Sequence, residues 1–177
     1  MKKLTRTFLL VCALAFAGGV MQTAIAFAYT NLPSATGFGD VRDDFSPSRT
    51  SLAFSAITQS EGATSEPQDN IVTGQAEYHD VDANGVNSRL HIEVNCLNIG
   101  PDGRTATISG VVKNASDPNA VGATAIFRVR DGGEGNNNEA DAITQVFTIA
   151  PDLNRNCFIT TGIQPTPIRA GNIQVRP

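Results

Sequence analysis

The chain has 177 residues, with 13 Lys or Arg against 17 Asp or Glu, and a formal net charge of −4 at pH 7. Without the three basic residues near its start, Lys2, Lys3 and Arg6, the balance is 10 basic against 17 acidic residues. This acidic balance argues against nucleic acid and anionic membrane surfaces as partners, because both need clustered positive charge.

Residues 1–28 have the pattern of a cleavable secretory signal peptide. The basic start is followed by an apolar run at 8–20, which is too short for a bilayer span of about 20 apolar residues. Small residues then offer cleavage after Ala26 or Ala28. We therefore expect a secreted or periplasmic protein whose mature chain does not insert into a membrane.

Residues 29–49 are rich in Ser, Thr, Pro, Gly and Asp and hold few large apolar residues. This composition predicts a flexible leader, with one edge strand near 37–39. The rest of the chain, 50–177, is expected to form a single β-domain, because a mature length of roughly 150 residues suits one domain with its own core.

Strand and turn signals recur at short intervals through this domain, and no helical period occurs. The clearest strand, 89–97, alternates cleanly and places Leu90, Ile92, Val94 and Cys96 on one face, as in a half-buried antiparallel strand. The expected strands are 51–57, 71–78, 89–97, 105–113, 123–130, 142–149 and 172–176.

Two turns predict the register of the central strands. Residues 82–85 and 100–103 both suit a three-residue hairpin loop in which the last Gly takes the left-handed conformation. The first hairpin is expected to pair Tyr78 with Leu90, Ala76 with Ile92, and Gly74 with Val94. The second is expected to pair Cys96 with Ile108, Val94 with Gly110, and Ile92 with Val112.

Such a chain of hairpins predicts an all-β fold, an antiparallel up-and-down meander of about seven or eight strands. It can close into a barrel or fold over as a sandwich. We favour the barrel over the sandwich, because closure removes exposed strand edges.

Cys96 and Cys157 are the two cysteines that remain after signal-peptide removal. An exported protein meets an oxidising compartment, so this even pair predicts a disulfide. Closing a loop of about 60 residues contributes roughly 4 kcal/mol in the chain-entropy model.

Four short motifs resemble those of a family of uncharacterised small secreted bacterial β-domain proteins. They are Cys96-Leu97-Asn98, Ala-Thr-Ile-Ser-Gly at 106–110, Phe127-x-Val129-x-Asp131-Gly132-Gly133-Glu134-Gly135, and Gly-Asn-Ile-Gln-Val at 171–175. The resemblance covers roughly residues 50–176. It implies an exported, single-domain, cysteine-paired β-protein, and it brings no activity, ligand or catalytic residue with it.

Two acidic loops carry the oxygen ligands that Ca²⁺ prefers. The candidate ligands are Asp80, Asp82 and Asn84 in the first loop and Asp131, Glu134 and Asp141 in the second. The first loop matches half of the calcium-loop pattern, but its twelfth position is His91 instead of Glu. Both loops also suit solvated hairpin turns. Calcium and a plain turn therefore stand as alternatives for each loop.

Catalytic signatures are sparse. His79 and His91 are the only histidines, and the predicted register points both outward, with Glu77 opposite His91. Neither a nucleophile elbow nor a zinc-protease motif occurs in the sequence. The main hypothesis is therefore an exported, non-catalytic β-domain that acts by binding or structure on an envelope or extracellular partner. The alternatives are a carrier barrel around a small apolar ligand and a secreted hydrolase with paired carboxylates.

Overall fold

The computed structural model describes residues 32–42, 48–62, 66–133, 139–149, 157–158 and 164–177. They belong almost entirely to one compact unit, Pro33–Pro177. The expected signal peptide and its cleavage positions at Ala26 and Ala28 lie outside the described residues. Among the residues that are described, no helix has the length and apolar character needed to cross a membrane.

The described residues form one antiparallel sheet of ten strands. The strands are β1 (Ser34–Arg42), β2 (Arg49–Ser60), β3 (Ile71–Val81), β4 (Asn87–Ile99), β5 (Thr105–Ala115), β6 (Thr124–Arg130), β7 (Ala142–Ile143), β8 (Phe147–Ile149), β9 (Thr166–Pro167) and β10 (Ala170–Arg176). Two single 3-10 turns, η1 (Pro67–Asp69) and η2 (Pro118–Ala120), lie in connections.

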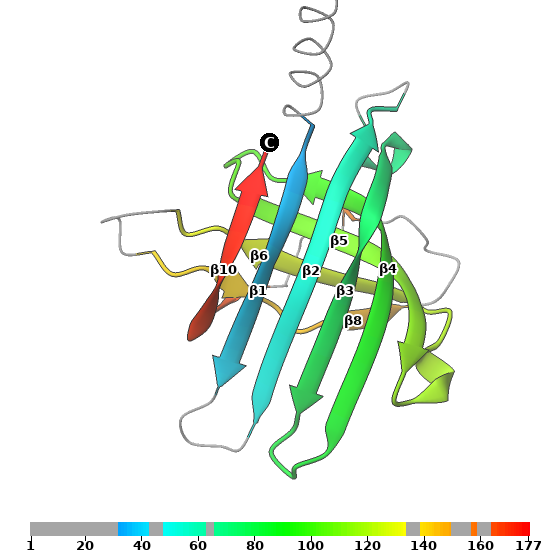
Figure 1. Ribbon diagram of the computed structural model, residues 1–177, viewed down its shortest axis with the longest axis vertical. Coiled ribbons are helices and arrows are strands. Elements are labelled where there is room, and N and C mark those ends of the chain that lie inside the picture. The colour runs from blue at the N-terminus through cyan, green and yellow to red at the C-terminus, as the bar shows by residue number, and fades with distance from the viewer. Residues whose placement is uncertain (1–31, 43–47, 63–65, 134–138, 150–156, 159–163) are drawn as a thin grey trace, which may run out of the picture. The chain divides into compact units, whose positions relative to one another are not determined.

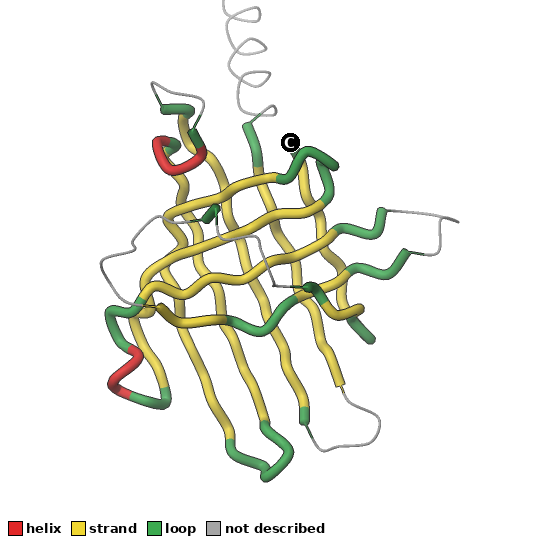
Figure 2. Tube along the Cα trace, turned by 180° about the vertical axis from the view of Figure 1, so that it is seen from behind, coloured by secondary structure: helices red, strands yellow, loops and turns green. Residues whose placement is uncertain are grey.

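The strand order is β10-β1-β2-β3-β4-β5-β6-β7-β9, and β8 pairs with β6 beside β7. Strands that follow one another from β1 to β7 are therefore neighbours, and β10 returns to pair with β1. The sheet curls through 293° into a half-barrel. Figure 1 shows β10 and β1 to β4 upright in front, while β5, β6 and β8 cross behind them; Figure 2 shows the same crossing from behind. The predicted all-β meander is confirmed.

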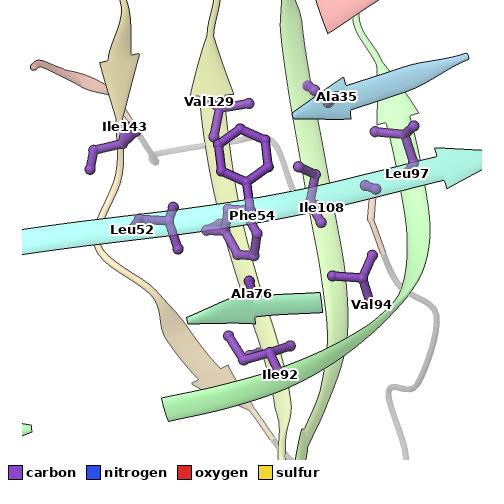
Figure 3. Packing of buried hydrophobic residues seen from close by; sticks show 14 of the residues in the cluster. Ala35, Leu52, Phe54, Ala76, Ile92, Val94, Leu97, Ile108, Val129 and Ile143 are labelled. Carbon is purple, nitrogen blue, oxygen red and sulfur yellow. The ribbon is translucent and has the colours of Figure 1, made fainter. Parts of the chain in front are cut away.

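Side chains fill the space between the upright strands in front and the crossing strands behind, which form the two walls of the half-barrel. The rings of Phe54 on β2 and Phe127 on β6 meet edge to face with centroids 5.8 Å apart, and both residues are buried. Figure 3 shows Phe54 among buried side chains of other strands, including Ile108 and Val129. Such an aromatic pair contributes about 0.5–1.5 kcal/mol beyond its buried area. The centre of the half-barrel is therefore a packed core.

The register predicted for the β3–β4 hairpin is confirmed. Tyr78 pairs with Leu90, Ala76 with Ile92, and Gly74 with Val94. The turn is closed by hydrogen bonds from the N–H of Asp82 to the carbonyl of Val86 and from the N–H of Gly85 to the carbonyl of Asp82, both 3.0 Å. Gly85 has a φ of 81°, in the left-handed region expected for it.

The register predicted for the β4–β5 hairpin is right at one end and wrong at the other. Ile92 pairs with Val112 and Val94 with Gly110, as expected. A bulge between Val94 and Cys96 then shifts the register, so that Leu97 faces Ile108 and Cys96 faces Ser109. Because neighbouring residues of a strand point to opposite faces, Leu97 enters the core and Cys96 turns to the outer face.

On that outer face Cys96 forms the predicted disulfide with Cys157, with a Cα–Cα distance of 5.9 Å. Both cysteines are fully buried. The side-chain amide of Asn98, two residues along β4, donates a hydrogen bond of 3.2 Å to the carbonyl of Cys157. Cys157 is thus fixed against the outside of the sheet.

The strand expected near 37–39 is present, but it is longer than predicted and is not an edge strand, and the prediction of a flexible leader is wrong for Ser34–Arg42. This segment is β1, an internal strand paired with β10 on one side and β2 on the other. Its glycines mark close approach instead of flexibility: a Cβ on Gly37 would lie 2.5 Å from the carbonyl oxygen of Asn172, and one on Gly39 would lie 2.7 Å from Ile168.

The strand predicted at 142–149 is also corrected, because it is divided into β7 and β8. Both short strands pair with β6. Between them, the N–H of Thr144 bonds to the carbonyl of Arg128 at 3.0 Å, and the Thr144 hydroxyl accepts from the N–H of Arg128 at 2.9 Å. The side chain therefore replaces one backbone bond of a regular ladder.

Candidate functional site

Polar side chains face the interior at one open end of the half-barrel. Thr50 pairs with Val41 and with Asp80, and all three are half-buried. Since residues two apart on a strand share a face, this row continues the interior face that Leu52 and Tyr78 form one step deeper. In Figure 1 the ends of β1 to β4 extend past the crossing strand β8, which leaves this row at the rim.

Tyr78 connects this polar row to the core. Its hydroxyl lies in hydrogen-bonding contact with the side chains of Thr50 and Asp80 and with the backbone of Val146. Thr50 also donates a 2.7 Å hydrogen bond to Asp80 Oδ1. Burial, reinforced by the nearby Asp80 charge, raises the pKa of Tyr78 to about 12. The hydroxyl is therefore a neutral group at physiological pH.

A buried carboxylate lies beside this rim on the outer face. Asp40 is only 4% exposed. Arg49 Nη2 lies 2.6 Å from its Oδ2, and Arg42 Nε lies 3.5 Å from its Oδ1. Burying a carboxylate is costly unless it is paired, and the two guanidinium groups provide that pairing. One positive charge remains in excess over Asp40.

Thr50, Asp80 and the two arginines border a groove of about 480 Å³ at the strand ends. Its lining includes Val41, Arg42, Arg49, Asp80, Gln145 and Thr166. The groove thus has a basic side, an acidic side, and neutral hydroxyl and amide groups beside apolar surface. A few placed polar groups on a partly apolar concave surface are typical of small-molecule sites.

The first candidate calcium loop lies next to this groove, and one oxygen of Asp82 already binds the turn. Asp82 Oδ1 accepts hydrogen bonds of 2.8 Å from the N–H groups of Asn84 and Val86. These bonds, above all the one from Val86, lower the pKa of Asp82. Asn84 is exposed at the turn. Nowhere in the described part of the chain do three or more His, Cys, Asp or Glu side chains gather as metal ligands, and calcium binding here stays a prediction.

The second candidate loop brings Asp131 and Asp141 together at the edge of β10. Asp141 Oδ2 accepts from the N–H of Ile173 at 2.7 Å, and Asp131 Oδ2 accepts from the N–H of Val175 at 3.0 Å. Their other oxygens accept 2.7 Å bonds from the N–H groups of Gly132 and Gly133, respectively.

Glu134, the third predicted ligand of this loop, lies outside the described residues. Asp131, Asp141 and the residues 172–176 of β10 line a groove of about 480 Å³. Since every oxygen of the two carboxylates accepts a backbone hydrogen bond, their observed role is to bind protein N–H groups. Calcium binding by this loop likewise stays a prediction.

Both histidines of the chain line one shallow groove on the outer face of β3 and β4. Glu77 pairs with His91 in the predicted register, and His91 Nδ1 lies 2.5 Å from Glu77 Oε1. The hydroxyl of Ser116, in the same groove, accepts the N–H of Arg89 at 3.0 Å. The serine therefore serves the β4–β5 backbone, which is a structural role.

The place of several residues at the open end was not found by sequence reasoning. Asp80 was predicted as a calcium ligand or as part of a solvated turn, whereas it is half-buried and bonded to Thr50. Its place two residues after Tyr78, on the inward parity of the strand, was the available signal. Gln145 and Thr166 reach the groove from other parts of the chain, and no local pattern marks them.

No protein-family model, curated protein or solved structure matches this chain significantly. The function of the domain is therefore inferred from its own residues.

Proposed function

We propose that this protein is an exported, non-catalytic domain that works by binding, and that the groove at the open end of the half-barrel is its binding surface. The ligand that fits this groove is small and polar, and it carries both a cationic and an anionic group. The single observation behind the proposal is the position of Thr50, Asp80 and Tyr78: a bonded polar row on the interior face, at the rim of a packed core.

The packed centre supports binding at the rim over transport in the interior. Phe54 and Phe127 meet across the two walls, 5.8 Å apart, where a carrier would hold its apolar ligand. The small inward residues Ala56 and Ala76 are also buried. The inner faces of their strands therefore belong to the packed core.

The charges of the groove support a zwitterionic ligand. Arg42 is half-exposed and has only a 3.5 Å contact with Asp40, which leaves it able to bind a carboxylate. At the end of β3, Asp80 provides a carboxylate for an ammonium group. A free amino acid or a short peptide carries this pair of charges.

The disulfide supports a function outside the cytoplasm. The Cys96–Cys157 bond is consistent with an oxidising compartment. The envelope or the extracellular medium is therefore the proposed location of the partner or ligand.

The test is a titration of the isotope-labelled mature protein, followed residue by residue in NMR spectra. The probes are glycine and a lysine-containing dipeptide as zwitterions, an N-acetylglucosamine oligomer as a neutral polar molecule, and laurate as an apolar one. We expect the zwitterions to shift the amide signals of Thr50, Asp80 and Thr166. Asp80→Asn should weaken that binding at least tenfold, because it removes the charge that faces the ammonium group.

Glu93→Gln is the matched control, because Glu93 is an exposed carboxylate paired with Lys113 on the outer face of β4. It should leave binding unchanged. Laurate shifting the core amides of Phe54 and Phe127 would establish the carrier in place of this proposal. If none of the probes shifts the rim residues, the open end is not a binding surface.

A further inference from the structure

The two ends of the curled sheet meet at a seam, and among the described residues backbone hydrogen bonds join the two ends at one corner. The link from β9 to β10 forms this corner. There the N–H of Ile168 bonds to the carbonyl of Asp141 and the N–H of Arg169 to the carbonyl of Asp40, both at 2.8 Å. Beyond the corner, β10 has a backbone ladder with β1, and within the described ranges no second strand pairs with its other side.

The free side of β10 still presents strong hydrogen-bond donors. In an antiparallel strand, the N–H groups of residues two apart point to the same edge. Ile173 and Val175 are two apart, and both point across the seam toward the carboxylates of Asp141 and Asp131. Their side chains are 2% and 8% exposed, so this part of β10 also covers the core.

We propose that Asp131 and Asp141 form a latch that closes the half-barrel. Each carboxylate takes one N–H of β10 and one N–H of its own loop, and so ties the C-terminal strand to the connection between β6 and β7. Hydrogen bonds to a charged acceptor are stronger than neutral ones. Two side chains thus provide the hydrogen-bond acceptors that the backbone of a neighbouring strand would provide in a fully closed barrel.

The latch also explains how the edge of β10 is protected. A strand edge with free N–H groups can pair with another chain, and proteins commonly block such edges with charged side chains. Here the carboxylates occupy the donors that an incoming strand would need. This assignment concerns the seam and is independent of ligand binding at the open end.

Each carboxylate binds a different amide of β10: Asp131 binds that of Val175, and Asp141 binds that of Ile173. Amide hydrogen exchange, measured by NMR on the mature protein, therefore gives a specific test. Asp131→Ala should speed exchange of the Val175 amide at least tenfold, with a smaller effect on Ile173. Asp141→Ala should do the reverse. In the unmodified protein both amides should exchange slowly, although they lie on the side of β10 away from β1.

Glu139→Ala is the control, because Glu139 is an exposed carboxylate next to the same loop that pairs with Arg130 at 3.1 Å. It should leave both amides slow. Where an Ala variant folds poorly, Asp131→Asn and Asp141→Asn keep one acceptor oxygen and should give the same reciprocal pattern at smaller size. Equal acceleration of both amides by either variant, or no acceleration, would overturn the latch.

Discussion

At the scale of single residues, Tyr78 shows how the core of this domain ends. Its ring belongs to the buried cluster, whereas its hydroxyl joins Thr50 and Asp80 at the rim. A buried hydroxyl needs such partners, because an unpaired polar atom in an apolar environment is destabilising. The same contacts that satisfy the hydroxyl also place Asp80 toward the groove.

The ionisation of Tyr78 is a direct test of this environment. A variant with Tyr29→Phe keeps Tyr78 as its only tyrosine, and its phenolate absorbance should rise near pH 12 instead of near the ordinary pKa of about 10. Because the folded pKa is raised, the stabilisation from neutral Tyr78 is complete below about pH 10 and is lost as the pH rises toward 12. The loss should reach about 3 kcal/mol. A single transition near pH 10 in the folded variant would contradict the burial of this hydroxyl.

The two turn aspartates show which residue roles a sequence can predict. Asp82 and Asp102 lie in turns recognised from their neighbouring glycines, and both accept backbone N–H groups of those turns. Such bonds are local, so the motif itself contains the partners. The roles of Asp131 and Asp141 were different: both were predicted as metal ligands or as parts of a solvated turn, because their partners on β10 are 44 and 32 residues away.

At the scale of elements, the hairpins followed from alternation and turn chemistry, and the irregularities did not. The β3–β4 register needed only a loop of the right length. The bulge in β4 depends on how β4 fits against β5. The sequence around Asn95 contains no Gly or Pro that would predict it. Cys96 was therefore predicted on the inner face, whereas it lies on the outer face. Its disulfide partner, Cys157, was predicted correctly.

The disulfide is the element-scale feature whose removal is easiest to measure. Replacing both Cys96 and Cys157 by Ala opens a loop with a sequence separation of 61. The free energy of unfolding should fall by about 4 kcal/mol in the chain-entropy model. Urea unfolding of the double variant checks this value, with the unmodified protein under reducing conditions as the control. Identical unfolding midpoints for the oxidised protein and the double variant would contradict a stabilising disulfide.

At the scale of the whole molecule, the sequence predicted the order of neighbouring strands but not how the sheet closes. A meander follows from consecutive hairpins, which are local. The pairing of β10 with β1 joins Arg176 to Ser34, near opposite ends of the domain. The groove at the open end is equally non-local, since Gln145 and Thr166 complete it from distant segments. Contacts of this kind leave no periodic signal in either segment.

The same pairing predicts that a circular permutant will fold. Because Ser34 and Arg176 are direct strand partners, a linker of about 2–5 residues can join them as a hairpin. New ends between Asn84 and Gly85 fall in an exposed turn. We expect a native-like NMR spectrum and faster refolding, because the least local pairing becomes local.

A second permutant, opened between Ile92 and Glu93, serves as the control. It cuts the middle of β4, which is paired on both sides, and should not fold. A failure of the first permutant under conditions where the parent folds would show that the 82–86 turn is needed as a covalent connection.

The bond between Cys157 and Cys96 on the outside of the sheet makes the stability of this domain depend on redox conditions. Under reducing conditions the pair stays as two thiols, and the domain lacks about 4 kcal/mol, a large share of the 5–15 kcal/mol by which small domains are usually stable. The reduced chain should therefore unfold far more readily than the oxidised one, so that oxidation acts as the step that secures the fold.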